Sequence, residues 1–99
     1  MKQQIFESYA KCVAEEFSIP HEMLFTKSKD RDCTAARHML YYLCAKRPMK
    51  ITVIAEYMAK HGYEIGHSSI IYGIKQTSKK LREDRDYIRA ARRIEEQIK

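Results

Sequence analysis

Residues 67–82 have the periodicity of a helix with two chemically different faces. At about 100° per residue, one face gathers apolar side chains: Ile70, Ile71, Ile74 and Leu81. The other gathers short polar groups near its start and cations further along: Ser68, Ser69, Tyr72, Lys75, Gln76 and Lys79. A helix in the major groove of DNA needs this division, because short polar groups reach base edges and longer cations reach phosphates. An ordinary amphipathic helix with a solvated face has the same pattern, so the surrounding sequence decides between them.

Helical spacing continues along the rest of the chain, and no segment is a convincing strand. The β-branched residues 51–54 have strand propensity, but a helical pattern continues through residues 57–59. Pro20 should end the first helix and open a short second one, and Thr34 is a fair N-cap for the third. The expected helices cover about 5–17, 21–25, 34–46, 52–61, 67–82 and 84–98, with a polar basic loop at 26–32 and a glycine-bearing turn at 62–66. The 99 residues are therefore predicted to form one all-α domain of about six helices, residues 1–99.

Positive charge is concentrated in two blocks. The formal net charge is +6 and the isoelectric point is about 9.3. Residues 27–50 hold seven Lys or Arg against two Asp, and residues 67–93 hold eight basic against three acidic side chains. A nearly neutral segment separates them. Two separated basic blocks favour two contacts with a polyanion such as double-stranded DNA.

Several other functional classes lack their usual sequence signals. The three cysteines, Cys12, Cys33 and Cys44, form no CxxC pair, which is typical of reduced thiols in the cytoplasm. No signal peptide or membrane-spanning apolar run is present. No GxxxxGK[ST] or GxGxxG loop occurs, so nucleotide hydrolysis has no visible machinery. No cofactor is expected. The Cys and His residues have no zinc-site spacing. No nucleophile, base and orienting carboxylate have a recognisable spacing, so an enzyme is not expected.

The helices expected at 52–61 and 67–82, joined by the turn, have the layout of a helix-turn-helix. Short motifs along the chain point the same way: Val-Ala-Glu-Glu-Phe at 13–17, Leu-Phe at 24–25, Thr-Lys-Ser-Lys-Asp-Arg at 26–31, Ala-Arg-His-Met at 36–39, Leu-Cys-Ala-Lys at 43–46, Gly-His-Ser-Ser-Ile at 66–70 and Lys-Leu-Arg-Glu-Asp at 80–84. Together, residues 13–98 resemble the C-terminal DNA-binding domain of the bacterial replication initiator DnaA. The resemblance implies a Trp-repressor-like helix-turn-helix.

The chain departs from that family at its signature. The family has Asp-His-[Ser/Thr]-Thr-Val where this chain has Gly66 followed by His67, Ser68, Ser69 and Ile70. The family's Gly-Arg-Asp before the histidine is absent, and the turn is longer. Because Asp can accept a hydrogen bond from the amino group of cytosine, its loss predicts a preferred site different from the initiator's usual box. The ATPase part of an initiator is also missing, so this chain alone is not expected to melt an origin with ATP.

The resemblance and the charge pattern together give a set of candidate DNA-binding residues. The resemblance implies that Arg31 enters the minor groove and that Arg37 and His38 contact backbone and bases; otherwise Arg31 is a solvated loop cation and the other two form a surface pair. His67 can instead cap its helix, and Tyr72 can be half-buried packing. The full set is Lys27, Lys29, Arg31, Arg37, His38, His67, Ser68, Ser69, Tyr72, Lys75 and Lys79.

The sequence thus predicts binding of double-stranded DNA at specific sites, as a regulator of replication or transcription, without chemistry. The missing ATPase part suggests a phage or plasmid source. Self-association and contacts with other replication or transcription proteins are left open. The alternative is a helical adaptor that uses its seven tyrosines and basic faces to hold an acidic protein.

Overall fold

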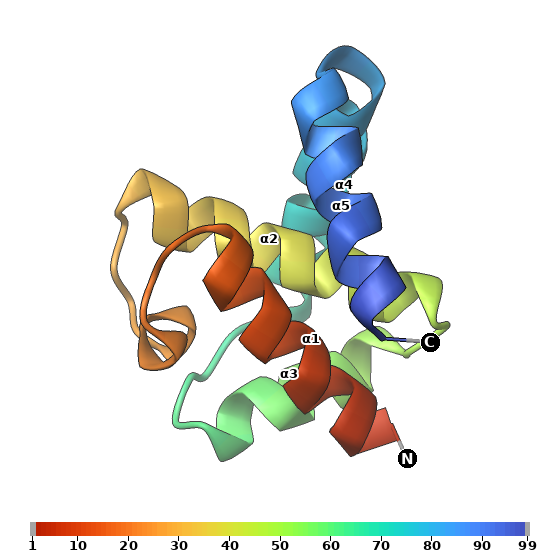
Figure 1. The fold of residues 1–99 in the computed structure, drawn as a ribbon. Helices are drawn as coiled ribbons and strands as arrows, with labels where there is room; N and C mark the ends of the chain where they lie inside the picture. The colour runs from red at the N-terminus through yellow and green to blue at the C-terminus, as the bar shows by residue number, and fades with distance from the viewer. Residues whose placement is uncertain (1, 99) are drawn as a thin grey trace.

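The computed structural model describes residues 2–98, and every regular element in that range is helical (Figure 1). The elements are α1 (Lys2–Glu16), the 3-10 helix η1 (His21–Phe25), α2 (Arg31–Lys46), α3 (Ile51–Lys60), α4 (His67–Glu83) and α5 (Arg85–Gln97). The predicted all-α fold class is confirmed. The β-branched residues 51–54 open α3 instead of forming a strand. No described helix is long and apolar enough to cross a membrane.

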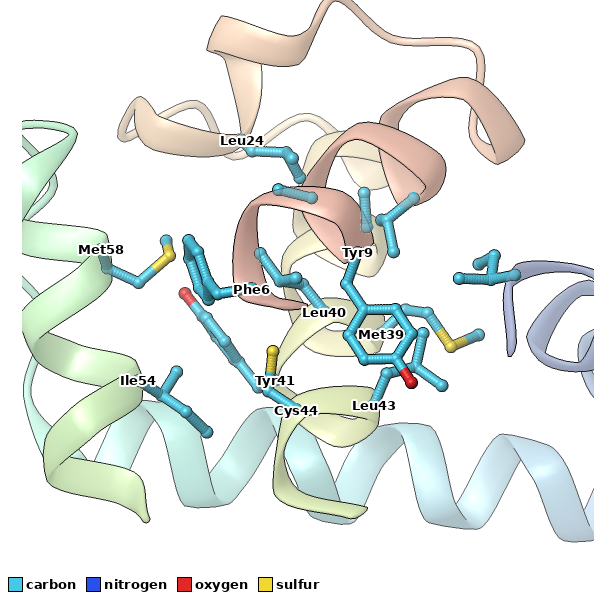
Figure 2. Packing of buried hydrophobic residues seen from close by; sticks show 14 of the residues in the cluster. Phe6, Tyr9, Leu24, Met39, Leu40, Tyr41, Leu43, Cys44, Ile54 and Met58 are labelled. Atoms are coloured by element: carbon cyan, nitrogen blue, oxygen red, sulfur yellow. The ribbon is translucent and has the colours of Figure 1, made fainter. Parts of the chain in front are cut away.

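The hydrophobic core lies where α1, α2 and α3 meet, with η1 above them (Figure 2). Phe6 from α1, Leu40 from α2 and Met58 from α3 are fully buried. Burying a side chain of this size contributes about 1.5–3 kcal/mol each. The expected inward face of α2 is confirmed, since it consists of buried residues: Ala36, Met39, Leu40 and Leu43.

Two helix starts differ from the prediction. The side chain of Asp30 caps α2: its Oδ2 accepts hydrogen bonds from the backbone N–H groups of Asp32, at 3.1 Å, and Cys33, at 3.4 Å. Thr34 is therefore not the N-cap, and the N-cap of α2 lies four residues earlier than expected. Pro20 lies before η1 with extended backbone angles, so it is the N-cap residue and not the first helical position.

The last two helices form an antiparallel pair that rises from the rest of the molecule (Figure 1). Asp84 alone connects them, and its carboxylate accepts a hydrogen bond from the backbone N–H of Asp86, at 2.9 Å. The start of α4 stays packed against α2, where Ile70 is fully buried. This arrangement leaves the opposite face of α4 exposed.

Candidate nucleic-acid interface

The first turn of α4 presents its side chains to solvent. His67, Ser68 and Ser69 are all exposed. Gly66, which precedes them as the N-cap residue, has no side chain to cap the helix. The backbone N–H groups of Ser69 and Ile70 bond only to the carbonyl of Gly66, at 3.2 and 3.4 Å. Short donors and acceptors at an accessible helix start are well placed to reach groups on a large ligand.

The two faces of α4 match the predicted division except at one position. Ile70, Gly73 and Thr77 are buried against the body of the protein. Tyr72, Lys75 and Lys79 are exposed on the other side, with Tyr72 58% exposed. The prediction that Ile71 faces inward is wrong, because its side chain is 42% exposed. Its position on the helix is about 100° away from Ile70, and the buried contacts of α4 do not extend that far.

The basic loop, residues 26–30, is ordered by its own polar side chains. The Oγ1 of Thr26 donates to the carbonyl of Met23, at 3.1 Å, and the backbone N–H of Asp30 donates to the Oγ of Ser28, at 3.2 Å. Lys27 and Lys29 are exposed. Arg31 is also exposed, but it is the first residue of α2 and not a loop residue. The side chains of Lys27, Lys29 and Arg31 therefore extend from an ordered backbone.

Arg37 lies inside the protein, with only 6% of its surface exposed. Its guanidinium donates to the carbonyls of Thr26, at 2.9 Å, and Ser28, at 2.5 Å, and also approaches the carbonyl of Met23 at 3.4 Å. The expected alternative of a surface pair is therefore wrong for this residue. Since most of its donors are used within the protein, Arg37 ties the basic loop to α2.

His38 belongs to α2, and its side chain is half-buried against α4. Its ring lies edge-on to the ring of Tyr72, with 5.9 Å between centroids. A Cβ atom at Gly73 would lie 2.7 Å from the Cδ2 of His38, so only glycine allows the two helices to approach this closely. Burial lowers the pKa of His38, and the charges of Arg37 and Lys80 lower it further.

Two adjoining pockets flank the contact between His38 and Tyr72. One, of about 280 Å³, separates the basic loop from α4 and is lined by Lys29, Arg31, Thr34, Ala35, His38, Tyr72, Gln76 and Lys80. The other, of about 380 Å³, lies behind the start of α4 and reaches Tyr63, Glu64 and Ser69. The first pocket brings together four predicted DNA-binding residues from distant parts of the chain: Lys29, Arg31, His38 and Tyr72. The prediction missed Lys80, although it lies one helical turn beyond Gln76 on the polar face.

Not every candidate residue lines these pockets. His67, Ser68, Lys75 and Lys79 lie elsewhere on the exposed surface of α4, and Lys27 lies outside both pockets. The four α4 residues lie on the exposed face of that helix, which also carries Tyr72 of the first pocket, and this face and the pocket make up the candidate surface. Within residues 2–98, no three His, Cys, Asp or Glu side chains converge as metal ligands would.

Comparison with known proteins assigns a family to this arrangement. Residues 7–77, from α1 into α4, match the family described as the bacterial DnaA protein helix-turn-helix. The chain is also similar to the chromosomal replication initiator protein DnaA of Nautilia profundicola, with 32% identity over 82 residues. That alignment covers 82% of this chain and 18% of the relative, so the chain spans less than a fifth of the initiator's length. The chain therefore belongs to the family of DNA-binding helix-turn-helix domains found in bacterial DnaA.

Proposed function

We propose that this protein recognises specific sites in double-stranded DNA, as a regulator of replication initiation or of transcription. One observation supports this most: Lys29 and Arg31 share a pocket with His38, Tyr72 and Lys80. A groove lined by cations from two sides suits the sugar–phosphate strand that separates a major groove from the next minor groove. The start of α4 then enters the major groove, and Arg31, which directly follows the basic loop, reaches the adjacent minor groove.

Each exposed candidate has a role in this arrangement. His67, Ser68 and Ser69 reach base edges, where hydroxyls and imidazoles form hydrogen bonds. Arg31 enters the minor groove, whose negative potential is strongest where the groove is narrow. Phosphates are held by cations around these contacts: Lys27, Lys29, Lys75 and Lys79. His38 and Tyr72 contact the backbone between the two grooves, and Arg37 acts indirectly by holding the basic loop.

The preferred sequence should differ from the usual initiator box. Gly66 has no carboxylate to accept a hydrogen bond from cytosine, and no atom lies within 4 Å of the position its Cβ would occupy. We expect these 99 residues to bind DNA without hydrolysing ATP, since no phosphate-binding glycine-rich loop occurs among them. The three free cysteines suit the reducing cytoplasm, where bacterial DNA lies.

Selection of bound duplexes from a random pool tests this proposal. We expect one preferred sequence, against which alanine variants separate two classes of contact. His67→Ala and Ser69→Ala should cost about 1–3 kcal/mol on the preferred duplex and little on a scrambled one. Lys75→Ala and Lys79→Ala should weaken binding to both duplexes by the same factor. Each should also make the slope of log association constant against log salt concentration shallower by about one.

Lys11→Ala is the matched control, because Lys11 is exposed on α1, away from this surface. Its binding should equal that of the unmodified protein. If the lysine variants of α4 changed sequence preference while His67→Ala and Ser69→Ala did not, the reading face would be wrongly assigned. If no sequence were enriched from the pool, site-specific recognition would be excluded.

A further inference from the structure

Two large hydrophobic side chains lie at the centre of the exposed face of α4, and hydrogen bonds to DNA do not account for both of them. Ile71 is 42% exposed and Tyr72 is 58% exposed. Among residues 2–98 these are the only large hydrophobic side chains with this degree of exposure. Tyr72 has a hydroxyl and packs against His38, whereas Ile71 has only hydrocarbon to offer. An exposed isoleucine keeps apolar surface in water, at a cost that binding to a partner would remove.

Ile71 lies between the residues assigned to bases and those assigned to phosphates. It follows His67 by four residues and Ser68 by three, so it lies one helical turn beyond both on the same side of α4. Lys75 follows it by four residues. The core does not require its side chain, because Ile70 and Ile74 already supply the apolar contacts of this turn. A helix that puts His67 and Ser68 at base edges therefore brings Ile71 to the same groove.

The major groove offers one prominent apolar group, the C5-methyl of thymine. An isoleucine is well suited to it, since its β-branched side chain keeps a narrow range of rotamers in a helix and presents a fixed shape. A protein partner is a poorer match, because two apolar side chains bordered by His67, Ser68 and Lys75 are far smaller than a stable protein interface.

We propose that Ile71 is a specificity-determining residue that packs against the methyl group of a thymine in the preferred site. This inference rests on the proposed function, because it requires α4 in the major groove. It predicts that one or two thymines are recognised by their methyl groups and not by hydrogen bonds. A cytosine at such a position should be tolerated better when it carries a 5-methyl group, which occupies the same place in the groove.

Deoxyuridine tests the proposal, because it differs from thymidine only by lacking the methyl group. Each thymine of the preferred duplex is replaced singly, and dissociation constants are measured by fluorescence anisotropy. For the unmodified protein we expect a loss of about three- to tenfold at one or two positions. Ile71→Ala should bind the thymine duplex more weakly and lose this discrimination, binding both duplexes equally. Ile71→Val should retain part of it.

Lys75→Ala serves as the matched control on the same face. It should weaken binding to the thymine and uracil duplexes by the same factor, which leaves the discrimination between them unchanged. A circular dichroism melt of each variant verifies folding.

The possible outcomes distinguish the role of Ile71 from site-specific DNA binding itself. If the protein selects a sequence but no uracil substitution weakens binding, or if Ile71→Ala keeps the full discrimination, the role of Ile71 is overturned and site-specific binding stands. A preferred site without any thymine also overturns it. If the protein binds no duplex, both proposals fail.

Discussion

At His38, folding is linked to the charge state of a side chain. Its pKa is lowered by burial first, and then by Arg37 on its own helix and Lys80 on α4. The rings of Tyr41 and Tyr72 pack around it. The folded protein therefore disfavours the protonated form relative to the unfolded chain, where a histidine titrates at about pH 6.5.

This linkage predicts a pH-dependent stability. Because the folded-state pKa of His38 lies below its unfolded value, the unfolded chain takes up the proton first as the pH falls. The stability from this residue is complete above about pH 6.5 and decreases on acidification until the folded pKa is passed. In urea unfolding between about pH 7.5 and 5, the unmodified protein should lose more stability than His38→Gln. Equal losses in both proteins would contradict the linkage.

Single residues were also where sequence patterns were least informative. Arg37 occupies a position that the family resemblance assigns to DNA, yet its guanidinium is buried on loop carbonyls. Ile71 has the right character for a core residue and is exposed. In both cases the sequence shows the chemistry of the side chain but not its surroundings. Helical periodicity shows roughly which face of a helix a residue lies on. For a residue near the edge of the apolar face, tertiary contacts decide whether its side chain is buried or exposed.

Whole elements were predicted better than single residues. All six helical segments were expected from apolar spacing and breakers, because each helix buries one stripe in a common core. The prediction missed the start of α2 because it placed the N-cap at Thr34, whose hydroxyl suits that position. Only the structure shows that the carboxylate of Asp30 accepts the N–H bonds instead. The packing of α4 on α2 through Gly73 was also missed, because proximity between distant helices leaves no local pattern.

Gly73 yields a prediction at the scale of these two helices. A Cβ there would lie 2.7 Å from the Cδ2 of His38 and 3.0 Å from the Cδ2 of Tyr41. Gly73→Ala should therefore push α4 from α2 and lower stability by about 0.5–2 kcal/mol, since overpacking outweighs the gain in helix propensity. Thermal or urea unfolding measures the change.

Gly66→Ala is the control for this substitution, because nothing lies within 4 Å of the added methyl group and the backbone is extended. It should not displace α4 from α2, and it should lower stability by only about 0.5 kcal/mol, because alanine is a poorer N-cap residue than glycine. If Gly73→Ala were as stable as the unmodified protein, the close approach of α2 and α4 would not hold in solution.

At the scale of the whole molecule, the fold brings the two basic blocks of the sequence onto one surface. Lys29 and Arg31 come from the first block, and Lys80 comes from the second, yet all three line one pocket. The Arg37 hydrogen bonds hold the basic loop against α2, and the His38–Tyr72 contact holds α4 against α2. The sequence predicted two separate contacts with a polyanion; it gave no sign that a single groove joins them.

The salt dependence of duplex binding tests the central claim, that this joined surface binds DNA through phosphate contacts, most directly. If about five to eight cations contact phosphates, the logarithm of the association constant should fall with the logarithm of salt concentration at a slope of about −4 to −7. A slope near zero, or equal binding to an acidic protein in competition, would contradict the account and favour a helical adaptor.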